Sequence, residues 1–326
     1  MWREYALTVG LPQTNYRNLA EAKLLMEACN FFWRGLGEAI QCPVAQLRSA
    51  QGDPVYATIV FVEERFPMDR TLQTFHLDDR LRCLLRIRAI KNLATECLMM
   101  FDREDRLAAP LDAALSFDGA PPYPVVRFGS IFAAPGPGNG RLKLTVPANA
   151  AFQHLAALPL EDNPIQVTRR AQETGRLDVI PADWVSLETD APPEVSYTID
   201  PDRDTNAAGL VYFANYIAFL EMGERSVLPR ASAWPHPSTS ADPAGRQLLH
   251  RRVAYFENAG LSDRVAIAVS RFASPARPDQ LGLRYQLTRA SDRKLICLSE
   301  ALMTFAPSPQ LPERRASEPH RAGVLP

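Results

Sequence analysis

The chain has few of the features that mark specialised classes of protein. Its 326 residues carry a formal net charge of −1 at pH 7, so the charge balance gives no reason to expect nucleic acid as a partner. No run approaches the ~20 apolar residues that a membrane-spanning helix needs, and the opening MWREYALTVG lacks the basic region and apolar core of a signal peptide. We therefore expect an ordinary globular protein of the cytoplasm, without a membrane partner.

Cysteine and histidine are also scarce, and their spacing argues against common catalytic and metal centres. The five cysteines are odd in number and scattered, which favours buried free thiols over a disulfide framework. The chain has no C-x-x-C pair and no His-x₃-His spacing, so we expect no metal site. The five histidines lie far apart in the sequence, and no G-x-S-x-G elbow of an α/β-hydrolase occurs.

What the sequence does contain is one plan of secondary structure that occurs twice. Residues 18–40 place apolar side chains on one helical face, with Asn18 as N-cap and Glu21 at the capping-box position. Strand patterns follow at 54–65, 80–90 and 93–101. A second helix is expected at about 209–228, followed by strands at 247–257, 263–273, 280–289 and 294–305. A long helix wrapped by an antiparallel sheet, present twice, predicts an α+β fold of the double hotdog type.

The plan divides the chain into four segments. We expect an N-terminal hotdog half at 1–105, a connector at 106–194, a C-terminal half at 195–306 and a disordered tail at 307–326, which is too polar to fold. The proline-rich connector contains the strand-like stretches VVRFGSIF and RLKLTV. GPGNGR, residues 136–141, has the glycines of a phosphate loop but leads into a strand, which favours a hairpin turn.

The start of the second helix carries the most informative motif. The stretch DTNAAGLVYFANYIAFLE, residues 204–221, resembles the active-site segment of acyl-CoA thioesterases of the 4-hydroxybenzoyl-CoA type. Asp204, Gly209, Tyr212 and Tyr216 match that pattern. The second acid of the pattern, which those thioesterases use to attack or to activate water, falls on Asn206.

A second resemblance covers most of the chain. VGLPQTNYRNLAEAKLLMEACNFFWRGLG near the start, together with RDTNAAGLVYFANYIAF, is similar to the LnmK-type acyltransferase/decarboxylase family of polyketide biosynthesis. The resemblance implies a double hotdog enzyme that decarboxylates methylmalonyl-CoA and transfers the propionyl group to an acyl carrier protein. It also implies that Tyr56, in GDPVYATIVF, carries the acyl group during the transfer.

An asparagine at position 206 suits decarboxylation, which needs donors at the thioester oxygen and no hydrolytic base. A carboxylate there would repel the carboxylate of the substrate, by about 4 kcal/mol at ~4 Å and an effective dielectric near 20. We expect Asp204, Gly209 and Leu210 to contact the substrate, with the small Gly209 allowing close approach to the backbone. The alternative is that Asn206 only caps the helix. Tyr56 likewise has a plain alternative as an ordinary strand residue.

A strip of arginines is the remaining candidate binding feature. RLRCLLRIR, residues 80–88, places Arg80, Arg82, Arg86 and Arg88 on one face of a strand. This strip either binds coenzyme A or an acidic carrier protein, or forms a solvated face paired with acids such as Glu63 and Glu64. Tyr212 and Tyr216, four residues apart, are expected to be core residues.

The sequence thus predicts an acyltransferase/decarboxylase that acts on acyl-CoA with an acyl carrier protein as partner and no cofactor beyond its thioester substrate. Two alternatives stay open: an acyl-CoA or acyl-carrier thioesterase that uses Asp204, and a non-catalytic module that binds acyl carrier protein. The acyl group and the oligomeric state, including a homodimer, are not determined by the sequence.

Overall fold

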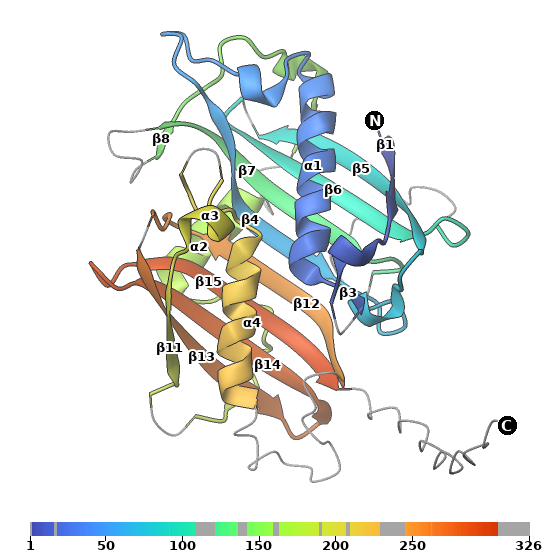
Figure 1. Ribbon diagram of the computed structural model, residues 1–326, viewed down its shortest axis with the longest axis vertical. Coiled ribbons are helices and arrows are strands. Elements are labelled where there is room, and N and C mark those ends of the chain that lie inside the picture. The colour runs from blue at the N-terminus through green and yellow to red at the C-terminus, as the bar shows by residue number, and fades with distance from the viewer. Residues whose placement is uncertain are drawn as a thin grey trace, which may run out of the picture.

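The computed structural model describes residues 2–15, 18–90, 92–107, 121–135, 142–158, 163–188, 191–206, 209–228, 245–261 and 263–305. Two long helices lie over one face of a large, mostly antiparallel β-sheet, one helix over each half (Figure 1). The expected α+β class is therefore confirmed. The predicted tail at 307–326 and the turn at 136–141 lie outside the described residues. Within those residues, no helix has the length and apolarity that crossing a membrane takes.

The sheet joins strands from both ends of the chain. The first half contains β1 (Trp2–Thr8), β4 (Tyr56–Arg65), β5 (Arg80–Ile90), β6 (Ala94–Arg103), β7 (Val125–Pro135), β8 (Leu142–Leu144) and β9 (Ala156–Ala157). The second half contains β10 (Val185–Ser186), β11 (Glu194–Thr198), β12 (Arg246–Tyr255), β13 (Arg264–Ser274), β14 (Arg277–Arg289) and β15 (Leu295–Phe305). The order is β1-β5-β6-β7-β4-β12-β15-β14-β13-β10, with β11 also beside β13. The seven strands predicted for the two halves are confirmed, each end within three residues.

The two halves meet where β4 pairs with β12. The pairing is antiparallel, with Glu64 opposite Arg251 and Val62 opposite Val253. Because these strands share a ladder of backbone hydrogen bonds, the sheet is continuous across the joint. β7, which falls in the predicted connector, pairs with both β4 and β6. The connector therefore contributes a central strand to the first half of the sheet.

The first long helix, α1 (Glu21–Ala39), buries one face against the sheet, as its apolar spacing predicted. Its start differs from the prediction. The N-cap residue is Ala20, whereas Asn18 lies in a short hairpin formed by β2 (Thr14–Asn15) and β3 (Asn18–Leu19) and has a φ of 73°. The predicted capping box was wrong, because Asn18 takes the left-handed conformation that asparagine tolerates in turns. Glu21, the first residue of α1, is 2% exposed.

The second long helix, α4 (Asn215–Val227), begins later than the predicted residue 209. A short helix, α3 (Pro201–Asp204), precedes it, and a bridge between Thr205 and Val211 closes a hairpin between the two helices. The predicted start was wrong because this hairpin has local hydrogen bonds of its own, which compete with helix formation. α1 and α4 contact one another over the joint of the sheet (Figure 1).

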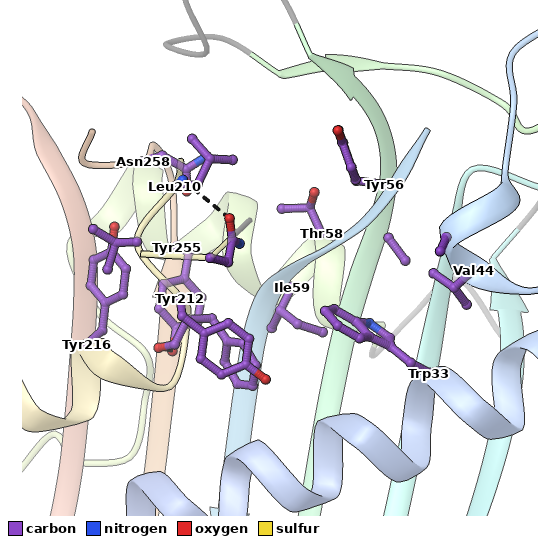
Figure 2. A pocket seen from close by; sticks show the side chains of 15 residues that line it. Trp33, Val44, Tyr56, Thr58, Ile59, Leu210, Tyr212, Tyr216, Tyr255 and Asn258 are labelled. Carbon is purple, nitrogen blue, oxygen red and sulfur yellow. Dashed lines mark hydrogen bonds between the residues drawn. The ribbon is translucent and has the colours of Figure 1, made fainter. Parts of the chain in front are cut away.

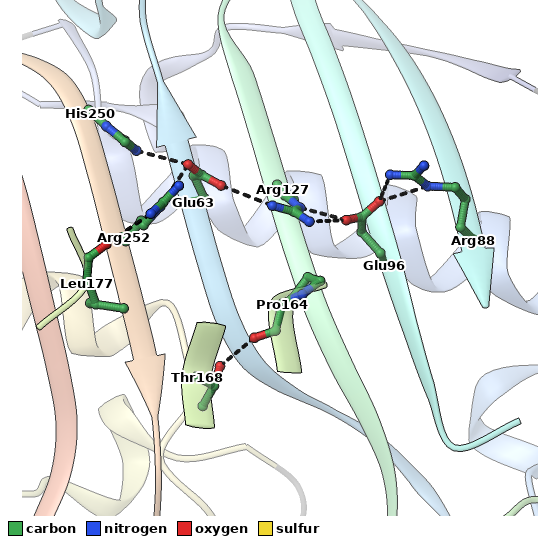
Figure 3. Close-up of polar contacts among 9 residues, drawn as sticks. All are labelled: Glu63, Arg88, Glu96, Arg127, Pro164, Thr168, Leu177, His250 and Arg252. Carbon is green, nitrogen blue, oxygen red and sulfur yellow. Dashed lines mark hydrogen bonds and ion pairs between the residues drawn. The ribbon is translucent and has the colours of Figure 1, made fainter. Parts of the chain in front are cut away.

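The other face of the sheet is covered by α2 (Pro164–Thr174) and the chain that follows it. Glu63 and Glu64 are adjacent on β4, so their side chains point to opposite faces of the sheet. Glu64 lies beside Glu21 of α1, and Glu63 therefore points to the face that α2 covers. A ladder of ion pairs crosses five strands, from Arg88 on β5 through Glu96, Arg127 and Glu63 to Arg252 on β12, as Figure 3 shows. Arg252 also donates to the carbonyl oxygen of Leu177 at 2.9 Å, which fixes the covering segment to the sheet.

Candidate active site

A cavity of about 460 Å³ lies between the two halves, beside the start of α4 (Figure 2). This volume lies within the range of roughly 300–1,000 Å³ that is usual for small-molecule sites. The first half contributes Trp33 from α1 and the chain around β4, and the second half contributes the hairpin before α4 and the end of β12. The lining residues are Trp33, Val44, Ala45, Tyr56, Ala57, Thr58, Ile59, Asn206, Leu210, Val211, Tyr212, Phe213, Tyr216, Tyr255 and Asn258.

Three of the residues predicted to act in catalysis or substrate binding meet in this cavity. Tyr56 comes from the start of β4, and Asn206 and Leu210 come from the hairpin before α4, about 150 residues later in the chain. The roles assigned to these residues remain predictions. All three residues line the same cavity, so the predictions concern one site.

The hairpin before α4 holds Asn206 through its own backbone. The Asn206 N–H donates to the Leu210 carbonyl oxygen at 2.8 Å, and the Leu210 N–H donates to the Asn206 side-chain oxygen at 3.3 Å (Figure 2). α4 begins only at Asn215, nine residues further along the chain. The alternative in which Asn206 caps the second helix was therefore wrong. Its side chain closes a loop at the rim of the cavity.

Gly209 sets the shape of that hairpin. Its φ of 71° lies in the left-handed region, which glycine enters without steric cost. Its N–H donates to the Asn206 carbonyl oxygen at 2.9 Å, which tightens the turn. Gly209 is not one of the lining residues, so the structure gives it a conformational part in the site, and direct contact with substrate stays a prediction.

Asp204 is next to the site but is engaged elsewhere. Its carboxylate is 3% exposed and accepts hydrogen bonds from the Tyr197 hydroxyl at 2.6 Å and from the Asp200 N–H at 2.9 Å. Arg203 pairs with its other oxygen at 3.2 Å. These contacts fix α3 and leave Asp204 outside the residues that line the cavity.

Two hydroxyls from β4 stand at the mouth of the cavity. Tyr56 is 40% exposed, and its ring points away from Trp33, toward the outside (Figure 2). Thr58 follows two residues later on the same strand face. Neither hydroxyl has a hydrogen-bond partner within the described part of the chain. Both residues line the cavity.

The inner wall is aromatic, and of its residues the sequence singled out only Tyr212 and Tyr216. Trp33, Tyr212, Phe213, Tyr216 and Tyr255 surround this end of the cavity. Tyr212 was expected as a helical core residue but lies ahead of α4. The Tyr255 hydroxyl donates to the Phe213 carbonyl oxygen at 3.0 Å, and the Tyr216 hydroxyl accepts from the Ala259 N–H at 3.3 Å.

Burial keeps these inner hydroxyls neutral. It raises the pKa of Tyr212, Tyr216 and Tyr255 well above the usual value for a phenol. Burial also raises the pKa of the neighbouring Cys29 thiol to about 12, although a hydrogen bond with Tyr212 opposes the shift. Neither a phenolate nor a thiolate is therefore present at this end of the cavity near neutral pH.

The described lining contains no carboxylate, histidine, lysine or arginine. It offers apolar surface and neutral hydrogen-bonding groups, namely hydroxyls and two asparagine amides. The first N–H groups of α4 are not free donors, because those of Asn215, Tyr216 and Ile217 donate to the carbonyl oxygens of Tyr212, Phe213 and Ala214. A site of this kind suits an uncharged acyl chain, with donors at one end for a carbonyl oxygen.

The arginine strip lies away from this cavity, on β5, and its members have partners. Arg82 pairs with Glu4 at 2.7 Å, Arg88 pairs with Glu96, and Arg80 lies 3.7 Å from Glu104. Arg86 stacks on Trp2. The acids Glu63 and Glu64 were the wrong partners to expect, since the neighbours of β5 are β1 and β6. Binding of coenzyme A or a carrier by this strip stays a prediction.

Comparison with known proteins finds likeness at the level of structure. No family model matches the sequence, and no curated protein matches it. A solved structure from Lactobacillus plantarum, described as an oleoyl thioesterase, aligns over 94% of this chain and 97% of its own with a TM-score of 0.63 at 12% identity. A 12:0-ACP thioesterase from Umbellularia californica covers 94% of both chains with a TM-score of 0.61 at 8% identity. An acyl-ACP thioesterase from Bacteroides thetaiotaomicron covers 93% of this chain and 97% of its own, with a TM-score of 0.55 at 8% identity. At these identities the likeness establishes that the chain shares the fold of these proteins over nearly its full length.

Proposed function

We propose that this protein is a thioesterase with a double hotdog fold, which cleaves an uncharged acyl group from coenzyme A or from an acyl carrier protein. The observation that carries the proposal is the neutral, largely apolar cavity at the start of α4, in a fold shared with acyl thioesterases over more than 90% of the chain. The acyl chain lies against the aromatic wall, and the thioester lies near Asn206 and the mouth.

The site would act on the thioester in the following way. Neutral donors of the lining, such as the Thr58 hydroxyl and the Asn258 side-chain amide, together with the positive end of the α4 dipole, stabilise the negative charge that develops on the carbonyl oxygen. Water adds to the carbonyl carbon, the carbon–sulfur bond breaks, and the thiol leaves with a proton while the acyl group becomes a free acid. Tyr56 is the residue at the mouth whose hydroxyl is available to take or give a proton.

The charge of the lining favours this reaction over decarboxylation of methylmalonyl-CoA. A methylmalonyl group would bring a carboxylate into a cavity whose described lining has no cation to receive it. Removing an unpaired carboxylate from water is costly, by several kcal/mol even after the protein relaxes. A neutral acyl chain avoids that cost and gains about 0.8 kcal/mol for each buried methylene.

One observation favours a second candidate, acyl transfer through Tyr56. The same lining that lacks a cation also lacks a carboxylate or imidazole to activate water. If the Tyr56 oxygen attacks the thioester, the carbon–sulfur bond breaks, coenzyme A leaves as the thiol with the phenol proton, and an acyl-tyrosine forms. A carrier thiol can then accept the acyl group and return its proton to Tyr56. Decarboxylation of methylmalonyl-CoA before transfer belongs to this candidate.

The fate of the acyl group separates the two candidates. Purified protein is incubated with dodecanoyl-CoA, propionyl-CoA and methylmalonyl-CoA in ¹⁸O-labelled water, with and without holo acyl carrier protein, and products are followed by mass. The proposal predicts free thiol and a labelled free acid from the neutral substrates, at a rate that the carrier does not increase. Release of carbon dioxide and appearance of propionyl-carrier would support the second candidate and contradict the first.

A further inference from the structure

The hairpin before α4 has a counterpart in the first half of the chain. Thr205-Asn206 and Leu210 repeat Thr14-Asn15 and Leu19 at a constant separation (205 − 14 = 191). Gly209, with a φ of 71°, corresponds to Asn18, with a φ of 73°. Each hairpin leads into one of the two long helices. The repeated letters and the repeated left-handed residue identify a common frame for the two halves.

The same separation relates the walls of the cavity to other residues. In this frame Tyr212 corresponds to Glu21 (212 − 191 = 21), Tyr255 corresponds to Glu64, and Trp33 corresponds to Glu224 (33 + 191 = 224). The elements correspond as well, since α1 matches α4, and β4 and β12 pair antiparallel at the joint. A second site of the same construction would therefore lie at the start of α1 and the end of α4.

That position is filled by a buried cluster of ionisable side chains. We call this cluster, Glu21, Glu64, Glu224, Arg246 and Arg251, the charged lock. Each of its members is at most 3% exposed. Three aromatic wall residues of the cavity thus have carboxylates as their counterparts.

The charged lock ties the two long helices to β12. Arg251 pairs with Glu21 of α1 at 2.6 Å and with Glu224 of α4 at 3.2 Å. Arg246 pairs with the same two carboxylates. The Tyr285 hydroxyl of β14 also donates to Glu224. Charges removed from water in this way are stable only while they remain paired. Because these side chains are almost completely inaccessible to solvent, this end of the fold is closed.

We propose that each chain has one acyl-thioester site, and that the equivalent position in the repeated frame is the charged lock, which holds α1, α4 and β12 together. This inference rests on the proposed function for the meaning of the site, while the lock itself rests on the contacts above. The two ends therefore differ in kind, since substitutions at the cavity alter binding and substitutions at the lock alter stability.

Binding stoichiometry gives the first test. The probe is the thioether analogue of dodecanoyl-CoA, which cannot be hydrolysed, titrated into the full chain by calorimetry. One probe bound per chain supports the inference, and two bound per chain overturn it. Absence of binding would count against the proposed function, and the lock would then be decided by the measurements that follow.

Thermal unfolding of matched variants tests the lock without any ligand. Glu224→Gln keeps the shape of the side chain and removes the charge that pairs with both arginines. We expect Tm to fall by roughly 5–15 °C, as loss of one partner from a buried ion pair implies. Glu221→Gln is the control. Glu221 lies one turn earlier on α4, is 20% exposed and is 3.9 Å from Arg246, so the Tm of this variant should fall much less. Equal Tm values for the two variants would overturn the lock.

Two further variants guard against a failure to fold and separate the two ends. Arg246→Lys keeps the charge and loses the forked geometry of the guanidinium, so a smaller fall in Tm is expected. Trp33→Phe, at the counterpart of Glu224, should weaken probe binding several-fold, whereas Glu224→Gln should leave it within twofold when measured well below Tm. Weaker binding in Glu224→Gln but not in Trp33→Phe would overturn the assignment of the two ends.

Discussion

Substitution of Gly209 tests whether the hairpin before α4 shapes the site. Gly209 has a φ of 71°, and an L-residue with a Cβ pays about 1–2 kcal/mol to adopt that conformation. Gly209→Ala should therefore lower the free energy of unfolding by about that amount if the turn is kept. If the turn instead changes to avoid the strain, the hydrogen bond between the Leu210 N–H and Asn206 is lost. In that case Asn206 and Leu210 move relative to Tyr56.

The matched control comes from the first half of the chain. Asn18 has a φ of 73° at the corresponding place, so asparagine is tolerated in this turn. Gly209→Asn should cost only a few tenths of a kcal/mol, well below Gly209→Ala. Urea unfolding followed by circular dichroism gives the stabilities, and KM for the best acyl-CoA substrate reports on the site. The reasoning fails if Gly209→Ala is as stable as wild type, or if Gly209→Asn is as damaging as Gly209→Ala.

Three further substitutions test single groups. Tyr56→Phe should reduce kcat by about 10²-fold or more with Tm unchanged, and near wild-type turnover would remove Tyr56 from the chemistry. Asn206→Asp should raise the KM of methylmalonyl-CoA relative to propionyl-CoA at least tenfold, since like charges at ~4 Å repel by about 4 kcal/mol at a dielectric near 20; an unchanged ratio would place residue 206 outside the substrate contact. Burial and the charge of Glu21 raise the pKa of Glu64, so its stabilising effect is present below about pH 4 and is lost as pH rises through the raised pKa. Glu64→Gln should flatten this decline in unfolding free energy as pH rises above about pH 4, and an equal slope in both proteins would contradict it.

The strands were predictable because their patterns are local. Residues 80–90 alternate polar and apolar side chains, and the structure has β5 over the same residues. The helix starts were not predictable in the same way. A short hairpin with a left-handed residue, Asn18 or Gly209, precedes the first turn of each long helix. The asparagines that the sequence suggested as helix caps, Asn18 and Asn206, belong to these hairpins instead.

The site was predictable only in part because it joins distant segments. The motif at 204–221 identified the segment, although as the start of a helix, and Asn206 and Leu210 do line the cavity. Trp33 and Tyr255 come from elements whose approach depends on the pairing of β4 with β12, which no local pattern encodes. The signal that could have found them is the repeat of Thr-Asn and Leu at a separation of 191, because it relates each wall residue to a position in the other half.

The two ends of the repeated frame show how one architecture supports opposite uses. An open cavity needs walls that keep their shape without paired charges, and the neutral rings of Tyr212 and Trp33 satisfy this while presenting apolar surface. A closed end has no substrate to admit, so it tolerates charges that hold one another, as Arg251 does with Glu21 and Glu224. Carboxylates in the cavity would need partners of their own, and those partners would fill it. Position 206 follows the same rule. It has an asparagine where the thioesterase pattern has a second acid, and the wall of a cavity for a neutral acyl chain is thereby kept free of ionised groups.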